Sequence, residues 1–393
     1  MENYFEFINS VKICAGENAL DNIVYELDFL GCKKPLILSD LGVSKAGVLD
    51  NLLKVLQKNG VNSDCIYNEI PADSDIEVIN SIAKIYSNLG CDGLIACGGG
   101  SVIDTAKGVR MILSQENVKD IMSLIGNEII KKGKHIPFIV FPTTCGTGSE
   151  CTAVAVIKNN TTGVKMEFIS SELLPDVAII DVRLTKTLPP KLIASSALDA
   201  LCHCVEALSG RQRNVMSDIY AQTAIRLIIE NLPIVLSSPT DQARSNLALA
   251  STLAGIAFSN SMVGIVHAIG HACGGEAGIP HGNAMTILLP ECMKFNLESC
   301  AEDYAEMLLY VAGAEVYSNT QKEDRASKTI MVLEEFICNV RDLSGIGLFL
   351  RDYNVSEESF DKIADKAIND GAIIVNKQIA TKEDIIKILK KCL

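Results

Sequence analysis

The sequence lacks the features that would direct it to nucleic acid, to membranes or to secretion. Acidic residues outnumber basic ones by 48 to 35, so the formal net charge is −13. This charge argues against nucleic acid or an anionic membrane surface as a partner. The 14 cysteines show no disulfide-framework spacing and there is no signal-peptide pattern, so we expect a cytoplasmic protein in a reducing compartment. With 48% hydrophobic and 21% charged residues, the composition is that of an ordinary globular protein.

Charged residues are also absent from one long stretch, 245–275, which a hydropathy scan would flag as membrane-spanning. The stretch contains several serine, threonine and asparagine residues and two histidines, which a helix facing lipid would have to satisfy internally. We therefore expect no membrane insertion, and a pair of buried core helices around a polar site.

The chain has no internal repeat, and its length of 393 residues favours two domains. In the first half, short apolar runs alternate with amphipathic stretches, which predicts parallel βαβ units in a mostly parallel, Rossmann-like sheet. A hairpin with its loop at 159–163 follows. From about residue 191 the pattern is helical throughout. We expect an α/β domain over 1–186 and an all-α domain over 187–393.

Four of the five histidines lie between positions 203 and 281, and an aspartate precedes the first by four residues. Asp199 and His203 would share one face of a helix, and His267 and His271 repeat that spacing. His281 follows after a turn containing glycine and proline. Any one such histidine is more often a core residue than a ligand, but the grouping favours a divalent metal site. Imidazole and carboxylate ligands suit Fe2+ or Zn2+.

Two glycine- and hydroxyl-rich turns follow predicted strands, at 97–101 and 142–150. Glycines let the backbone approach a ligand closely, and the N-terminus of the following helix attracts an anion such as a pyrophosphate. The first turn lacks the GxGxxG spacing, so alone it is a weak signal; two such turns favour a cofactor crevice. Asp40 ends another strand, where it would either bind a ribose 2′-hydroxyl or cap the next helix.

Five segments together resemble the iron-containing (group III) alcohol dehydrogenases, whose fold is similar to that of dehydroquinate synthase. They are GGGSVIDTAKGV, PTTCGTGSE, LPDVAIID, ALDALCHCVEAL and VGIVHAIGHACGGEAGIPHGNAMTILLP. The resemblance implies a nucleotide-binding α/β domain, a helical catalytic domain and an active site between them. It also implies a homodimer, Fe2+ with Zn2+ as the alternative, and NAD in preference to NADP because of Asp40.

Matched residue by residue, the family's functional positions fall on the following side chains. The metal ligands are Asp199, His203, His267 and His281. The further active-site histidine is His271. The dinucleotide contacts are Asp40, Gly98, Gly99, Gly100, Ser101, Asp104, Thr143, Thr144, Thr147 and Lys165. The substrate pocket contains Val154, Phe258 and Val263.

The resulting hypothesis is an oxidoreductase that interconverts a small primary alcohol and its aldehyde with NAD(H), with the substrate oxygen on the metal. His271 would either relay the alcohol proton or orient a ligand or substrate through a hydrogen bond. One alternative is a carbon–oxygen lyase like dehydroquinate synthase, or a glycerol dehydrogenase-like enzyme. The lyase would need basic residues in its cleft, and the segments 199–210 and 262–289 contain neither lysine nor arginine. A non-catalytic metal-binding protein would leave the glycine-rich turns without a role.

Overall fold

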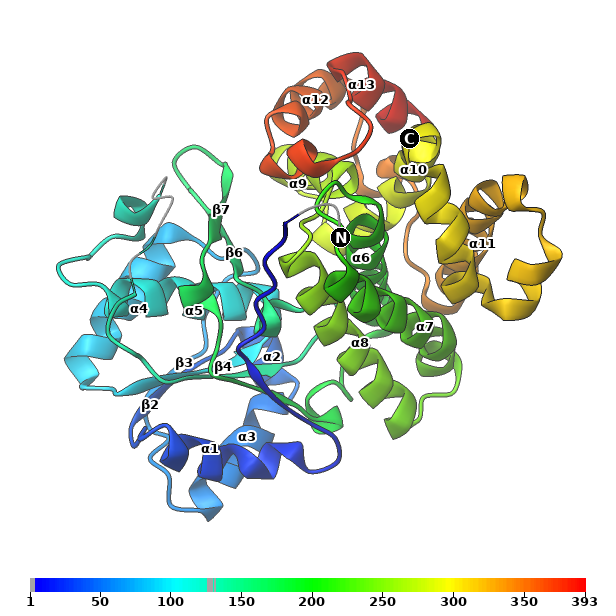
Figure 1. Ribbon diagram of the computed structural model, residues 1–393. Coiled ribbons are helices and arrows are strands. Elements are labelled where there is room, and N and C mark those ends of the chain that lie inside the picture. Colours follow the sequence, from blue (N-terminus) through cyan, green and yellow to red (C-terminus); the bar gives the residue numbers. More distant parts are fainter. Residues whose placement is uncertain (1–3, 126–129, 131) are drawn as a thin grey trace. The chain divides into compact units, whose positions relative to one another are not determined.

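The computed structural model describes residues 4–125, 130 and 132–393, which form two compact units (Figure 1). One unit consists of Ile8–Leu188. The other consists of Pro189–Leu393 together with the N-terminal residues 4–7. Phe7 stacks on Tyr220 with ring centroids 5.7 Å apart, so an aromatic contact fastens the N-terminal segment to the helical unit.

The first unit is built on a six-stranded parallel sheet with the order β1-β8-β5-β4-β2-β3, accompanied by an antiparallel pair, β6 and β7. The strands are β1 (Lys12–Ala15), β2 (Pro35–Leu38), β3 (Ile66–Tyr67), β4 (Gly93–Gly98), β5 (Phe138–Pro142), β6 (Val154–Lys158), β7 (Lys165–Ile169) and β8 (Val177–Ile180). The parallel sheet and the hairpin of β6 and β7 confirm the sequence-based prediction. The short edge strand β1 was not predicted.

Helices cover both faces of this sheet. They are α1 (Ile23–Phe29), α2 (Leu41–Lys45), α3 (Val48–Lys58), α4 (Ile76–Leu89) and α5 (Gly100–Ser114). Short 3-10 turns join them: η1 (Ala19–Asn22), η2 (Ile121–Leu124), η3 (Ser149–Cys151), η4 (Ser171–Leu173) and η5 (Val182–Leu184).

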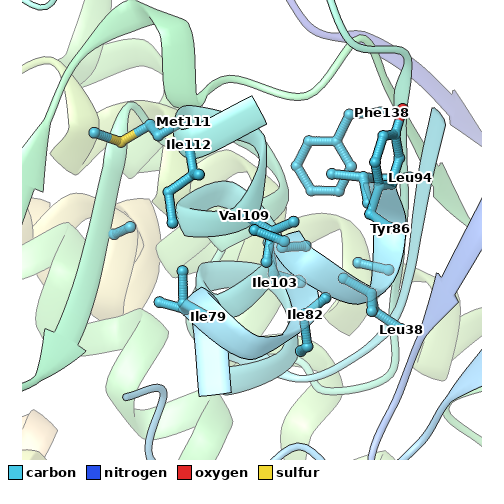
Figure 2. Packing of buried hydrophobic residues seen from close by; sticks show 14 of the residues in the cluster. Leu38, Ile79, Ile82, Tyr86, Leu94, Ile103, Val109, Met111, Ile112 and Phe138 are labelled. Carbon is cyan, nitrogen blue, oxygen red and sulfur yellow. The ribbon is translucent and has the colours of Figure 1, made fainter. Parts of the chain in front are cut away.

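Alternate residues of the central strands enter two separate cores, because successive side chains of a strand point to opposite faces. Leu94 and Phe138 pack with α4 and α5 in one core, and Figure 2 shows them in the same cluster as Ile103 and Val109. Ile95, the next residue along β4, packs with α1 and α3 in the other core. Strands buried on both faces read as continuous apolar runs, which is why the sequence predicted them well.

The strand order reverses beside β2. From β2 the chain moves outward to β3, and it then returns to β4 on the other side of β2. In open parallel sheets, ligands bind at the carboxyl ends of the strands at such a switch point. Ser39 Oγ donates to the carbonyl of Cys97 over 2.8 Å, which ties the carboxyl ends of β2 and β4 together.

The second unit is helical. Its helices are α6 (Pro190–Ser209), α7 (Val215–Ser237), α8 (Asp241–Ser259), α9 (Ile265–Ala277), α10 (His281–Asn319), α11 (Arg325–Ser344), α12 (Phe360–Ile368) and α13 (Lys382–Lys391). Its 3-10 turns are η6 (Lys322–Asp324), η7 (Leu350–Tyr353), η8 (Glu357–Ser359) and η9 (Gly371–Val375). The uncharged stretch 245–275 forms most of α8 and α9, as predicted. Non-helical backbone at Cys300 and Gly313 interrupts α10.

Two helices, α6 and α7, are long and apolar enough to cross a membrane by length and composition alone. For α6, 89% of the apolar window is buried inside the protein, and for α7 the figure is 39%. Core helices pass the same test, so the observation is weak evidence for a membrane. The burial of α6, which also carries Asp199 and His203, is that of a core helix.

Candidate metal and nucleotide sites

The helix α6 carries the first two residues of the predicted metal site. Pro190 at its first position suits a helix start, since the missing N–H needs no partner there. Asp199 and His203 lie one turn apart on the buried face, and both are almost fully shielded from solvent. His203 stacks on Phe258, a predicted pocket residue, with ring centroids 4.1 Å apart.

The other two predicted ligands come from α9 and from the first residue of α10. His267 lies in the first turn of α9, and His281 begins α10 after Pro280. Gly282 explains how His281 reaches α6: a Cβ at this position would lie 2.4 Å from the carbonyl oxygen of Ser195. Only glycine therefore allows the start of α10 to approach the backbone of α6 so closely.

Three imidazole nitrogens converge on one carboxylate oxygen. The Nε2 atoms of His281, His267 and His203 lie 3.4, 3.7 and 3.9 Å from Asp199 Oδ1. One ligand atom from each of the four residues lies within 4.8 Å of all the others. Donor atoms about 2.1 Å from a tetrahedral ion are roughly 3.4 Å apart, so the set is close to the size that a divalent ion requires.

Two of these atoms are buried without a hydrogen-bond partner in the described part of the chain. They are Asp199 Oδ1 and His267 Nε2. A buried polar atom without a partner costs free energy, and a bound cation would remove that cost. The donor set therefore fits a divalent metal ion with nitrogen and oxygen ligands.

The protonation states of three of the four side chains suit a bound cation. Burial alone would raise the pKa of Asp199, but the neighbouring histidines hold it well below its usual range. Burial lowers the pKa of His203 to about 3, and it also lowers the pKa of His281. These two imidazoles are therefore neutral at neutral pH, the state in which imidazole binds a metal.

Glu206, which sequence analysis did not single out, orients His267. Its Oε2 lies 2.5 Å from His267 Nδ1, and its Oε1 accepts from the backbone N–H of Val266 over 2.7 Å. The carboxylate thus also sits at the N-terminus of α9, where the helix dipole favours it. Gly264 leaves space for this carboxylate, because a Cβ at that position would lie 3.2 Å from Glu206 Oε1. The only signal in the sequence was the position of Glu206 one turn beyond His203.

His271 lies one turn beyond His267 on α9, and its ring is 5.8 Å from that of His267 and 5.5 Å from that of His281. Its Nδ1 lies 3.1 Å from Asp370 Oδ2, a contact that no sequence pattern suggested. Val263, predicted for the substrate pocket, is buried in an apolar cluster that includes Phe258.

The first glycine-rich turn joins β4 to α5, at the switch point of the sheet. No side chain caps α5, whose N-cap is Gly99. Its first N–H groups are therefore not occupied by a side-chain cap, as anion binding requires. The second turn packs directly on the first: a Cβ on Gly99 would lie 3.0 Å from the methyl carbon of Thr144, and a Cβ on Gly100 only 2.8 Å from that of Thr147. The two predicted turns thus form one surface.

Other predicted dinucleotide contacts have structural partners of their own. Asp104 accepts from Ser149 Oγ over 2.6 Å and from the N–H of Val156 over 3.0 Å, which ties α5 to the second turn. The backbone N–H of Thr143 donates to Gly98, and Lys165 forms a 2.7 Å ion pair with Asp73.

Ser101 and Val154 also lie in this unit. Ser101 Oγ donates to the carbonyl of Ala72, and Val154 begins β6. The fully buried Lys107, which sequence analysis missed, donates to Val154 O over 2.7 Å and to Thr152 O over 2.9 Å. Burial lowers the pKa of Lys107 to about 8.

Asp40 is the N-cap of α2, and its Oδ1 accepts from the N–H of Val43 over 2.9 Å. The capping interpretation is therefore correct. It does not conflict with a ribose contact, because a carboxylate has two oxygens and can accept several hydrogen bonds.

A parallel sheet with a glycine-rich turn at its switch point, together with a histidine and carboxylate cluster on helices, points to the class of metal-dependent dehydrogenases. Comparison with known proteins identifies the family. Residues 10–182 match the family model for iron-containing alcohol dehydrogenase, and residues 193–393 match the model for the C-terminal part of the same family. The chain belongs to the iron-containing alcohol dehydrogenases, which confirms the resemblance, and it is an oxidoreductase that interconverts alcohols and aldehydes.

Individual relatives cover nearly the whole chain. The 1,3-propanediol dehydrogenase of Klebsiella pneumoniae is 33% identical over 379 residues, which are 96% of this chain and 95% of the relative. The NAD-dependent methanol dehydrogenase of Bacillus methanolicus is 31% identical, with 96% and 97% covered. Among solved structures, a 1,3-propanediol oxidoreductase matches with a TM-score of 0.93 at 31% identity, and both chains are fully covered.

Proposed function

We propose that the protein interconverts a small primary alcohol and its aldehyde with NAD(H), using Fe2+ held by Asp199, His203, His267 and His281. The observation that carries the proposal is the convergence of the three Nε2 atoms on Asp199 Oδ1, at separations of 3.4 to 3.9 Å. The relatives support the substrate class, since their names specify 1,3-propanediol and methanol. Zn2+ is the alternative metal, because it accepts the same ligands.

When bound, the ion supplies a Lewis acid for the substrate oxygen. The residues of the chain compensate charge, orient a ligand and transfer the proton. The carboxylate of Asp199 offsets one positive charge, and Glu206 keeps His267 turned with its Nε2 toward Asp199. His271 takes the proton that the alcohol loses on oxidation and returns it on reduction. The side chains assigned to the substrate, Phe258, Val263 and Val154, are apolar, which suits a short carbon chain.

We further propose that NAD binds across the two glycine-rich turns. The uncapped N-terminus of α5 would bind the pyrophosphate, with Gly98, Gly99, Gly100 and Ser101 lining its approach. Thr143, Thr144 and Thr147 would line the other side. Lys165 and Asp104 complete the assigned set, with Asp104 holding the second turn in place. Asp40 favours NAD, since its charge repels the 2′-phosphate of NADP.

The test is a steady-state assay of the Fe2+-reconstituted protein with NADH and a panel of short-chain aldehydes, and with NAD and the matching alcohols. We expect aldehyde-dependent oxidation of NADH that chelation abolishes and Fe2+ restores. A protein that carries Fe2+ and binds NADH in a fluorescence titration, yet reduces none of the aldehydes, would contradict the substrate class.

A pair of histidine variants tests the ligand assignment. His281→Ala should lose bound metal, whereas His135→Ala should retain it. His135 is a matched control because it pairs with Asp176 in the other unit and belongs to no part of the cluster. Metal content by elemental analysis is the readout, and equal metal in the two variants would refute the assignment of His281.

We also propose a homodimer in the cytoplasm. β1 lies at one edge of the sheet, and beside it Tyr25 and Phe29 are exposed and stacked with ring centroids 6.3 Å apart. An open edge with exposed aromatic side chains suits a contact with a second copy of the chain. The fourteen cysteines are free thiols, as a reducing compartment would keep them. Light scattering of the purified protein measures the mass, and a monomer would contradict the dimer.

A further inference from the structure

We propose that Asp370 is the positioning residue for His271, holding its Nδ1–H and so directing its Nε2 toward the reacting oxygen. The proposal rests on the function proposed above, and it gives a role to one residue in the C-terminal part of the chain. The two side chains are 99 positions apart in the sequence, and their contact is created by the packing of η9 and α9.

The hydrogen bonds determine which nitrogen of His271 carries the proton. Asp370 Oδ2 lies 3.1 Å from His271 Nδ1, while Asp370 Oδ1 accepts from the N–H of Ala372 over 2.9 Å. An ionised carboxylate only accepts hydrogen bonds, so Nδ1 must be the donor. In the neutral ring the lone pair then lies on Nε2, which is the atom able to accept a proton.

The segment that carries Asp370 is fixed to α9 at both of its ends. At the start of η9, Ala372 is buried in the apolar cluster that contains Ala268 of α9, with Ile373 packed against it. At the end of η9, Asn376 Oδ1 accepts from the N–H of Ile265, the first residue of α9, over 3.4 Å. The carboxylate is thus held by packing, as a positioning residue requires.

Burial strengthens the contact. The side chain of His271 is 12% exposed and that of Asp370 is 18% exposed, so bulk water covers little of either. A hydrogen bond to an ionised group in such surroundings is stronger than one between neutral groups, and it restricts rotation of the ring. The bond to Asp370 thus favours the tautomer in which Nε2 carries no proton and can accept one.

The reaction balances in protons and electrons with the alcohol and NAD+ as its only reactants. On oxidation, the alcohol loses a hydride to NAD+ and its hydroxyl proton to Nε2 of His271. The products are the aldehyde, NADH and an imidazolium whose Nδ1–H stays bonded to Asp370. On reduction the same proton returns to the alcohol oxygen, and no further oxidant or reductant is needed.

Asp370→Asn is the decisive variant. Asparagine caps a helix about as well as aspartate, so the bond to Ala372 and the fold should survive. The amide no longer requires Nδ1 to be the donor. We expect kcat to fall about 10- to 100-fold with KM, metal content and melting temperature unchanged. Asp365→Asn is the matched control, since Asp365 is a 58% exposed aspartate on α12 that pairs with Lys382; it should keep full activity.

A second readout does not depend on activity. In the Zn2+-loaded protein, 15N NMR of labelled histidine distinguishes the two neutral tautomers, and the His271 signals are assigned by their loss in His271→Ala. We expect the Nδ1–H form in the wild type and an Nε2–H form or a mixture in Asp370→Asn. An Nε2–H form in the wild type, or an Asp370→Asn variant with wild-type kcat and tautomer, would overturn the proposal. Absence of aldehyde reduction by the wild type would instead refute the proposed function, while the tautomer would still decide whether Asp370 positions His271.

Discussion

Replacing Glu206 by glutamine should weaken metal binding although Glu206 is not a ligand. The carboxylate accepts two hydrogen bonds, from the N–H of Val266 over 2.7 Å and from His267 Nδ1 over 2.5 Å. A glutamine has one oxygen and one NH2 group, so one of these two buried donors would face another donor. Losing a buried hydrogen bond in this way costs about 1–3 kcal/mol.

The loss should appear in metal affinity as well as in stability, because the orientation of His267 depends on the same carboxylate. Removing the partner of a metal-ligating histidine lowers affinity by about 10- to 100-fold. That range corresponds to about 1.4–2.8 kcal/mol of binding free energy. The cost in folding stability and the loss of binding free energy are separate quantities, and each is measured on its own.

The assay is a competition titration of the metal-free protein with a chelator of known affinity, for the wild type and for Glu206→Gln. It is run over a range of pH and the pH-independent affinities are compared, because Glu206 also raises the pKa of His267 and so makes a proton compete with the ion. Glu276→Gln is the control, because Glu276 lies on the same helix as His267 but pairs only with Lys362 and Lys366 in the described contacts. A Glu206→Gln variant that binds metal within about twofold of the wild type would refute the orienting role, since the expected loss is at least about tenfold.

Four further predictions concern the two sites. His267→Ala should lower metal affinity at least about tenfold, and activity with it, because one of four ligands is lost. Full metal occupancy with unchanged turnover would refute the four-ligand assignment. Asp40→Gly should lower kcat/KM with NAD and raise kcat/KM with NADP. A loss of about 1 kcal/mol in stability with an unchanged cofactor preference would mean that Asp40 serves only as the cap of α2. Gly282→Ala should destabilise the protein by about 1–3 kcal/mol in denaturant titrations and lower its metal content, since the new Cβ would lie 2.4 Å from a carbonyl oxygen. Unchanged stability and metal content would show that the close approach of α10 to α6 is not needed. Burial lowers the pKa of His267, but Glu206 and Asp199 outweigh burial and raise that pKa to about 10. An ion that binds Nε2 must therefore displace a proton, and apparent metal affinity near neutral pH should rise about tenfold per pH unit. A metal affinity that does not change with pH would contradict this prediction.

Much of the α/β unit was readable from the sequence because its signals are local. Strands buried on both faces are continuous apolar runs, so β2, β4 and β5 stand out between amphipathic helices. β1 was missed because its four residues are only partly buried and its sequence is mixed. The turn at Asn159 and Gly163 was readable as well, since residues of this kind favour turns wherever they occur.

The ligand pattern was likewise visible in the sequence, because Asp199 and His203 are one helical turn apart and share a face by the geometry of the helix alone. Only the tertiary structure decided that His267 and His281 reach the same carboxylate oxygen, since that depends on how closely α9 and α10 approach α6. The partners Glu206 and Asp370 depend on packing still more. They lie 61 and 99 positions from the histidines that they hold. A local pattern records which face of a helix a residue occupies, but the contact between two distant side chains exists only once the helices that carry them have packed.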